Sequence, residues 1–208
     1  MLIAIEGIDG AGKATAARRL TAYLRKAGRE VTEVAFPRYE VEPYGPLLRD
    51  ALRDSSGGAA AVNARALLFA LDRHAATPSI LAANAGGDVV IDRWVFSNAA
   101  YLDAQLDSDA ADWIIDLEFN KLGLPVPDAT VLVTGAVDNA RARVRRRASR
   151  SERVVDVLEN AVSVQQGAAG AYERFAQENN WLVVRNTSTV GAFHQGIDSV
   201  AAGLLKRA

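Results

Sequence analysis

Short apolar runs alternate along this chain with longer segments in which apolar residues recur at helical spacing. This alternation predicts a parallel sheet with helices on both faces, because each crossover between parallel strands supplies a helix that covers the sheet. The apolar runs that predict strands cover residues 2–6, 31–36, 89–92, 130–133 and 181–184. We therefore expect an α/β fold in three layers, with a five-stranded parallel sheet, in a single domain that spans residues 1–208.

Helical periodicity is clearest in three segments, residues 14–27, 62–83 and 190–207. In the second of these, an interior Pro78 predicts a kink or an early end of the helix. The stretch before it, residues 54–61, is rich in serine, glycine and alanine and predicts a loop. Ligands bind beyond the carboxyl ends of the strands in such sheets, so we expect functional residues in the loops that follow the first four strands.

A glycine-rich loop with the pattern G-x-x-x-x-G-K directly follows the first predicted strand. Glycines allow the backbone to curl so that successive N–H groups point at phosphate oxygens, and Lys13 would contact the β- and γ-phosphates. The next position holds Ala14, where a serine or threonine hydroxyl normally binds Mg²⁺, while Thr15 keeps the following hydroxyl. The loop predicts a site for ATP and Mg²⁺. The residues expected to bind the nucleotide are Gly7, Asp9, Gly10, Ala11, Gly12, Lys13, Ala14 and Thr15.

An acidic residue and an arginine follow the third predicted strand. Asp92 is placed to hold Mg²⁺ directly or through water, and the Arg93 guanidinium can form a fork with a phosphate. Asn98 and Tyr101 lie one helical turn apart, and an amide and a phenol on one helix face suit a base edge and a sugar hydroxyl. The structural alternative is that Asn98 caps a helix and Tyr101 packs in the core.

Two further segments offer aromatic and cationic side chains. Residues 36–39, Phe-Pro-Arg-Tyr, end the second strand, where Arg38 either binds a second phosphate or is a solvated surface arginine. Phe69 and Arg73 lie four residues apart on a predicted helix. They either stack on a base and bind its edge, or form a core phenylalanine beside a surface arginine.

An arginine-rich segment follows the fourth strand, with arginines at positions 141, 143, 145, 146, 147, 150 and 153 and only Glu152 opposing them. It lacks the interleaved aromatics of a single-stranded nucleic-acid surface, so a lid over residues 140–153 that closes arginines onto a transferring phosphate is favoured. Asp156 and Glu159 follow on one helix face and could hold Mg²⁺ or a sugar hydroxyl.

The composition excludes other classes of protein. There are 24 lysines and arginines against 25 acidic residues, and this net charge of −1 argues against a nucleic-acid partner. The chain has no cysteine, which excludes disulfides and thiolate metal sites. It begins with a core strand and has no apolar run long enough to span a bilayer, so we expect no membrane partner and a cytoplasmic location.

In order and combination, these motifs resemble those of the thymidylate kinases, which are P-loop nucleoside monophosphate kinases. The resemblance covers essentially the whole chain and rests on residues 6–13, 36–39, 69–73, 92–101 and 118–125. It implies the P-loop NTPase fold, a homodimer, and transfer of the γ-phosphoryl group of ATP to dTMP for dTTP biosynthesis. Because Gly10 stands where some members carry an arginine, the chain is similar to the actinobacterial members, with catalytic arginines in the lid.

The resemblance also implies roles for individual residues. Phe69 should stack on thymine, Arg73 should bind a base carbonyl and Asn98 the pyrimidine edge. The implied substrate-binding residues are Asp9, Phe36, Pro37, Arg38, Tyr39, Phe69, Arg73, Arg93, Asn98, Tyr101 and Asp156. The implied catalytic residues are Lys13, Arg93, Arg146, Arg150 and Arg153, and the implied metal ligands are Asp9, Asp92 and Glu159.

Three positions depart from the family pattern. Ala14 lacks the metal-binding hydroxyl, so Asp9 and Glu159 are expected to carry more of the Mg²⁺. Trp94 and Leu158 stand where relatives usually place tyrosines.

Three alternatives remain open at this point. A deoxynucleoside kinase would need a carboxylate after the second strand to deprotonate a hydroxyl, where this chain has Pro37 and Arg38. The other two are a nucleotide-binding regulatory protein that has lost catalysis, as Ala14 suggests, and an arginine-rich RNA binder.

Overall fold

The computed structural model describes residues 1–53, 58–148, 161–186 and 189–207. Its sheet contains five parallel strands in the order β2-β3-β1-β4-β5, which confirms the predicted sheet and α/β class. The strands are β1 (Leu2–Glu6), β2 (Val31–Ala35), β3 (Asp88–Asp92), β4 (Ala129–Thr134) and β5 (Leu182–Arg185).

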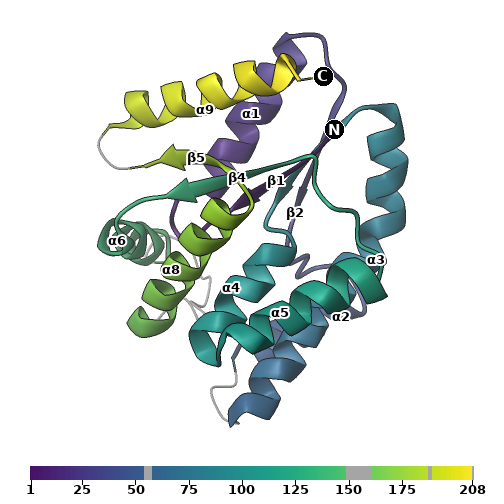
Figure 1. The fold of residues 1–208 in the computed structure, drawn as a ribbon, viewed down its shortest axis with the longest axis vertical. Helices are drawn as coiled ribbons and strands as arrows, with labels where there is room; N and C mark the ends of the chain where they lie inside the picture. Colours follow the sequence, from purple (N-terminus) through teal and green to yellow (C-terminus); the bar gives the residue numbers. More distant parts are fainter. Residues whose placement is uncertain (54–57, 149–160, 187–188, 208) are drawn as a thin grey trace.

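Helices cover both faces of this sheet in the described part of the chain. They are α1 (Lys13–Lys26), α2 (Tyr44–Ala51), α3 (Gly58–Gly86), α4 (Val95–Gln105), α5 (Ser108–Asp116), α6 (Val137–Ala148), α8 (Val162–Glu178) and α9 (Val190–Leu205), with a π-helical segment, η1 (Leu117–Lys121), after α5. Figure 1 shows α1 and α9 together on one side of the sheet and α4, α5 and α8 on the other. These are the three layers that the alternating pattern predicts.

Burial follows the position of each strand in the sheet. All five residues of β1, at the centre, are buried, whereas the edge strands β2 and β5 each expose residues on their outer positions. A strand flanked by neighbours and covered on both faces has no solvent-facing positions, which is why β1, β3 and β4 read as continuous apolar runs.

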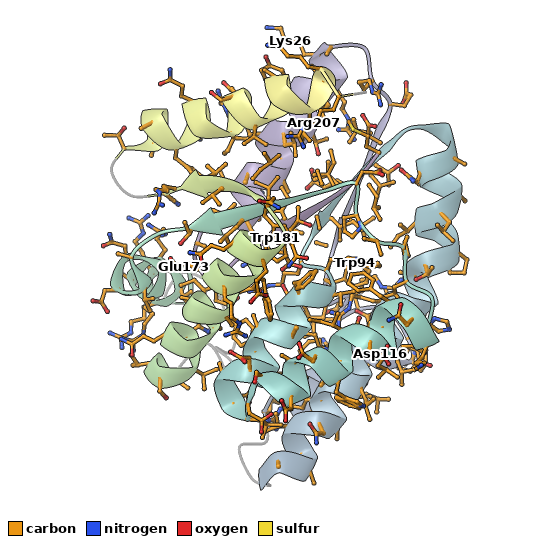
Figure 2. All side chains as sticks on the ribbon, viewed as in Figure 1. Lys26, Trp94, Asp116, Glu173, Trp181 and Arg207 are labelled. Carbon is orange, nitrogen blue, oxygen red and sulfur yellow. The ribbon has the colours of Figure 1, made fainter. Side chains whose placement is uncertain are left out.

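The core extends from the sheet into the helices. Leu20 and Leu24 of α1 are buried at the predicted helical spacing. Trp94, two residues after the end of β3, is also fully buried, packs against the ring of Phe36 and donates its indole N–H to the Pro125 carbonyl at 3.1 Å. Figure 2 places Trp94 inside the fold. The indole N–H thus has a hydrogen-bond partner at the position where relatives usually have a tyrosine hydroxyl.

One predicted boundary was wrong. Helix α3 already begins at Gly58 and runs through Pro78 to Gly86, so residues 58–61 are helical rather than a loop, and Pro78 does not end the helix. Proline has no backbone N–H, so Pro78 cannot donate to the carbonyl of residue 74, four positions earlier in the helix. Residue 74 is exposed, and its carbonyl can bind water instead. The remainder of the predicted loop lies outside the described residues.

Candidate functional site

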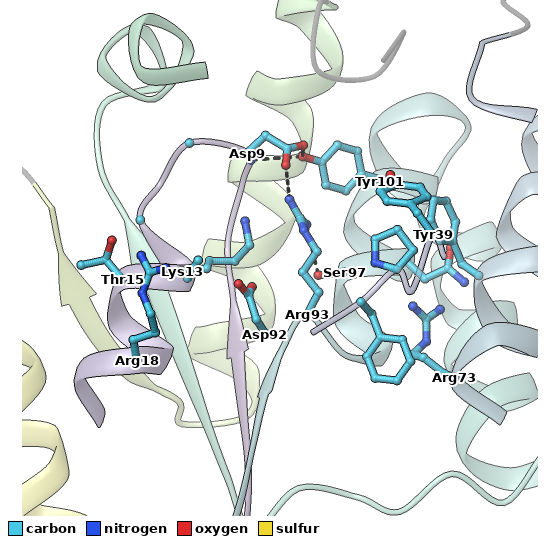
Figure 3. A pocket seen from close by; sticks show the side chains of 17 residues that line it. Asp9, Lys13, Thr15, Arg18, Tyr39, Arg73, Asp92, Arg93, Ser97 and Tyr101 are labelled. Carbon is cyan, nitrogen blue, oxygen red and sulfur yellow. Dashed lines mark hydrogen bonds and ion pairs between the residues drawn. The ribbon is translucent and has the colours of Figure 1, made fainter. Parts of the chain in front are cut away.

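A cavity of about 610 Å³ lies at the carboxyl ends of the central strands. The phosphate loop and the start of α1 contribute Asp9, Gly10, Gly12, Lys13, Ala14 and Thr15 to its wall. Gly7 and Ala11 of the same loop do not line it. Opposite the loop, the predicted substrate-binding residues that line the cavity are Phe36, Pro37, Tyr39, Phe69, Arg73, Asn98 and Tyr101. Figure 3 shows Asp92 and Arg93 between these two groups.

The loop backbone requires glycine at its tightest points. Gly7 has φ +139°, and a Cβ there would lie 2.3 Å from the Val133 carbonyl oxygen of β4. Gly10 has φ +75°, and its Cβ would lie 2.1 Å from the carbonyl oxygen of Ala140 in α6. Both clashes involve backbone, which cannot move aside as a flexible side chain can. Helix α6, which carries the arginine-rich sequence, is therefore packed directly onto the phosphate loop.

A second contact ties α6 to this loop. Arg143 donates from Nε to the Gly10 carbonyl at 2.7 Å, and its Nη2 is buried with no partner within the described part of the chain. Burial lowers the pKa of Arg143. The arginines of this segment that were expected to be catalytic, Arg146, Arg150 and Arg153, do not include Arg143.

Lys13 begins α1 and is buried, with its ammonium donating to the Ile8 carbonyl at 2.8 Å. Burial and the nearby positive charge of Arg93 lower the pKa of Lys13 to about 8, against the opposing effect of Asp9. A cation that is held in a desolvated position is stabilised when an anion arrives. Together with the N-terminus of α1, this ammonium gives the loop end of the cavity the positive potential that suits a phosphate group.

Arg93 lies between the loop and the opposite end of the cavity. It has a left-handed backbone, with φ +72°, and its Nη2 donates to Asp9 Oδ1. The Tyr101 hydroxyl donates to Asp9 Oδ2 at 2.6 Å. Burial opposes ionisation of Asp9, but the charges of Arg93 and Lys13 outweigh it and lower the pKa of this carboxyl. The pair fixes an ionised carboxylate and a guanidinium at the middle of the cavity (Figure 3).

The turn at Arg93, with its left-handed backbone, is stabilised by hydrogen bonds to Glu6, the last residue of β1. Glu6 is fully buried and accepts hydrogen bonds from the backbone N–H groups of Trp94, at 3.0 Å, and Ser97, at 3.2 Å. The Ser97 hydroxyl also donates to Glu6, and the Tyr172 hydroxyl of α8 donates to Ser97 Oγ at 2.9 Å. Burial raises the pKa of Glu6. The sequence signal for this role was a single carboxylate that ends an otherwise apolar strand.

At the far end of the cavity, Arg73 and Asn98 meet a buried carboxylate, Glu118 of η1. Arg73 donates to it from Nε at 2.6 Å and from Nη2 at 2.7 Å, and Asn98 donates from Nδ2 at 2.8 Å. The sequence alone left open whether Asn98 is a helix cap and Arg73 a surface residue. In the structure both are buried, and both line the cavity.

Arg38, which was expected to bind the acceptor phosphate, contacts Asp72 of α3. Its guanidinium donates to the buried Asp72 carboxylate at 2.9 Å and to the Asp72 carbonyl at 2.6 Å, and it does not line the cavity. Arg18, which was not among the predicted site residues, lines the cavity from α1, one turn beyond Ala14. Arg18 could have been found from the sequence, because it lies four residues after Ala14 and therefore on the same face of the helix.

Four predicted site residues, Arg150, Arg153, Asp156 and Glu159, lie outside the described residues, as does Leu158, which departs from the family pattern. Arg146 lies on an exposed position of α6 and does not line the cavity.

Asp92 is the carboxylate in the cavity that best fits a magnesium ion. Its Oδ1 is buried and has no hydrogen-bond partner among the described residues, whereas both oxygens of Asp9 accept hydrogen bonds. No cluster of three or more histidine, cysteine, aspartate or glutamate side chains occurs within the described ranges. Mg²⁺ in phosphotransferases is bound by one or two carboxylates together with substrate phosphates, so a lone carboxylate suffices.

This parallel sheet, its glycine loop with Lys13 and its following carboxylate define a P-loop nucleotide-binding domain. The sequence model of thymidylate kinase matches residues 5–197, so the chain belongs to the thymidylate kinase family. It is therefore a nucleoside monophosphate kinase, as the motifs predicted. None of its described helices is both long and apolar enough to cross a membrane.

Known proteins similar to this chain bear the same name. The thymidylate kinase of Mycobacterium tuberculosis is 43% identical over 194 residues, which cover 88% of this chain and 91% of the relative. A probable thymidylate kinase of Thermococcus onnurineus is 31% identical over the full length of both chains. A solved structure of thymidylate kinase from Candida albicans has a TM-score of 0.70 and 21% identity, and the match covers 99% of this chain and 89% of that one. This last likeness concerns the fold.

Proposed function

We propose that the chain transfers the γ-phosphoryl group of Mg-ATP to dTMP and releases dTDP and ADP, a step towards dTTP. The observation that carries this proposal is one cavity lined by Lys13 and the glycine loop at one end and by Arg93 further along. Lys13 and the loop serve the donor, and Arg93 serves the acceptor phosphate. Beyond Arg93, the aromatic face of Phe69 and the polar groups of Arg73 and Asn98 provide a place for a pyrimidine base.

The chemistry asks mainly for alignment and for neutralised charge. The acceptor phosphate has a second pKa of about 6 and is already anionic at neutral pH, so its attack needs no general base. Lys13 and Arg93 hold the two phosphates in one cavity, and Asp9 holds the Arg93 guanidinium. The family arginines Arg146, Arg150 and Arg153 remain our proposal for the charge that develops on the transferring group.

Asp92 would hold Mg²⁺ through water, and the ion would supply charge neutralisation to the donor phosphates. We expect Asp92→Asn to raise the Mg²⁺ concentration for half-maximal activity by about 10-fold, the scale at which lost outer-shell partners weaken metal binding. Asp9→Asn is the comparison, because the Asp9 oxygens are engaged by Arg93 and Tyr101. A larger shift for Asp9→Asn in parallel Mg²⁺ titrations would place the metal at Asp9, as the sequence suggested.

The depressed pKa of Lys13 predicts a loss of efficiency at alkaline pH. Because burial and Arg93 lower this pKa to about 8, the free enzyme loses the ammonium as the pH rises above 8 and keeps it below. We expect kcat/KM for ATP, which reports the free enzyme, to fall about tenfold per pH unit on that side. Bound phosphates stabilise the ammonium, so kcat should persist to higher pH. A kcat/KM that stays flat to about pH 9.5 would contradict this assignment.

The proposed reaction is tested by ADP release with separate acceptors, namely dTMP, dUMP, dCMP, UMP, AMP and thymidine. Preference for dTMP is expected. Turnover of thymidine but not of dTMP would instead identify a deoxynucleoside kinase. The structure disfavours that enzyme, because the carboxylate near the end of β2, Asp72, accepts hydrogen bonds from Arg38 at both oxygens. ATP binding without turnover of any acceptor would identify a regulatory nucleotide-binding protein.

The family resemblance also supports a homodimer in the cytoplasm. Sedimentation of the purified chain tests the dimer, with a single species of twice the 22.2 kDa chain mass as the expected result.

A further inference from the structure

The base end of the cavity is shaped by a carboxylate that does not line it. Glu118 has no exposed surface, and η1, where it lies, closes with an i to i+5 hydrogen bond from the Leu122 N–H to the Leu117 carbonyl at 2.8 Å. Asp116 and Asn120, on either side, are exposed. The π-turn thus directs one carboxylate inward among neighbours that face solvent. Such turns are often found at functional sites.

Glu118 fixes the orientation of the Asn98 amide. The Nδ2 group of Asn98 donates to Glu118 Oε1 at 2.8 Å and to the Ala66 carbonyl at 2.9 Å. A backbone carbonyl and an ionised carboxylate can accept hydrogen bonds but cannot donate them. Turning the Asn98 amide over would therefore place its Oδ1 against two other oxygens. The NH₂ group therefore stays on this side, and Oδ1 remains as the polar atom that Asn98 can offer to a ligand in the cavity.

The same carboxylate fixes Arg73 through two nearly parallel hydrogen bonds, from Nε and Nη2. This fork–fork geometry holds the plane of the guanidinium. Nη1 has no hydrogen-bond partner within the ranges that the structure describes, and Arg73 lines the cavity, as Figure 3 shows. The base end thus presents a donor from Arg73 beside an acceptor from Asn98.

We propose that Glu118 is a positioning residue that selects the base, by imposing this donor–acceptor pattern on Arg73 and Asn98. The inference rests on the proposed function. Thymine and uracil carry a carbonyl oxygen next to a ring N–H, which complements a donor beside an acceptor. Cytosine carries an amino group next to an unprotonated ring nitrogen, so it faces Arg73 with a donor and Asn98 with an acceptor. Buried polar groups left without partners make such a site reject the wrong base.

The test is Glu118→Gln, which keeps the shape of the side chain. An amide has only one acceptor oxygen, so its NH₂ group faces Arg73 in either orientation. In the orientation that replaces Oε1 it also faces Asn98, which favours a turned-over Asn98 amide. We expect the ratio of kcat/KM for dTMP to that for dCMP to fall at least about 10-fold, the equivalent of one hydrogen bond. Asp116→Asn, an exposed carboxylate two residues away, is the matched control and should leave the ratio unchanged.

Glu118→Asp provides a second variant if Glu118→Gln fails to fold, which thermal unfolding would reveal. The shorter carboxylate keeps the charge that Arg73 needs, but it cannot reach both partners, so the ratio should fall here too. Equal losses of efficiency with dTMP and dCMP in the folded variants would show a purely structural role and overturn the inference.

Failure of the proposed function is distinguishable from failure of this inference. A wild-type protein that does not phosphorylate dTMP refutes the proposed function itself. A wild-type protein that prefers dTMP, with Glu118 variants that keep the preference, refutes only the role of Glu118.

Discussion

Replacing Lys13 with alanine is expected to reduce turnover by about 1,000-fold, the upper end of what one preorganised donor contributes to a transition state. The ammonium is buried at the start of α1 and donates to the loop carbonyl of Ile8, which fixes its position in the phosphate loop. In free-energy terms the loss corresponds to about 4 kcal/mol of transition-state stabilisation. The measurement is kcat and KM for ATP at saturating dTMP.

The matched control is Lys26→Ala, which removes a lysine from the exposed last turn of the same helix. It should leave kcat within about twofold of the wild type, since surface substitutions away from a site have small effects. A Lys13→Ala protein that keeps most of its turnover while ATP binding weakens would mean that the ammonium binds the ground state and transition state equally.

The second large effect is expected for Arg93→Ala, which should lower kcat/KM for dTMP by about 1,000-fold or more. The substitution removes the phosphate fork and also leaves the Asp9 carboxylate without its cation, facing the incoming acceptor phosphate. An unpaired carboxylate in such a site repels a second anion. The loss should therefore exceed that of a single hydrogen bond.

This explanation predicts partial rescue by a second substitution. In the double variant Arg93→Ala with Asp9→Asn, the repulsion is absent, so kcat/KM for dTMP should recover by at least about tenfold relative to Arg93→Ala. Arg174→Ala removes an arginine from an ion pair with Asp103 outside the cavity, and as the control it should leave kcat/KM for dTMP unchanged. If the two substitutions in the cavity have independent effects, Asp9 does not act through Arg93.

The sequence was sufficient for the order and type of the main elements because each rests on a local signal. The continuous apolar runs predicted β1 to β5 to within two residues at each end, and the phosphate loop was recognisable from its glycines and Lys13. Helix α3 was misjudged at its start because residues 59–61 are alanines, which are the strongest helix formers, although they follow serines and glycines that favour a loop.

Site residues whose roles depend on long-range pairing could not be predicted in the same way. Glu118 meets Arg73 across 45 positions of sequence, and Glu6 meets Ser97 across 91. Arg38 was expected at a phosphate because nothing in its local sequence shows that Asp72 binds it. A buried carboxylate and its partner are each ordinary polar residues until the fold brings them together.

The contact between Gly10 and α6 has a consequence for how this enzyme could have arisen. An arginine at position 10 would need the space that the Ala140 carbonyl and the Val144 side chain now occupy. A loop that carries its own arginine and an arginine-rich helix seated on that loop are thus alternative architectures in this geometry. A lineage could not pass from one to the other by exchanging single residues while keeping α6 in place. The arginine and the helix position would have to change together.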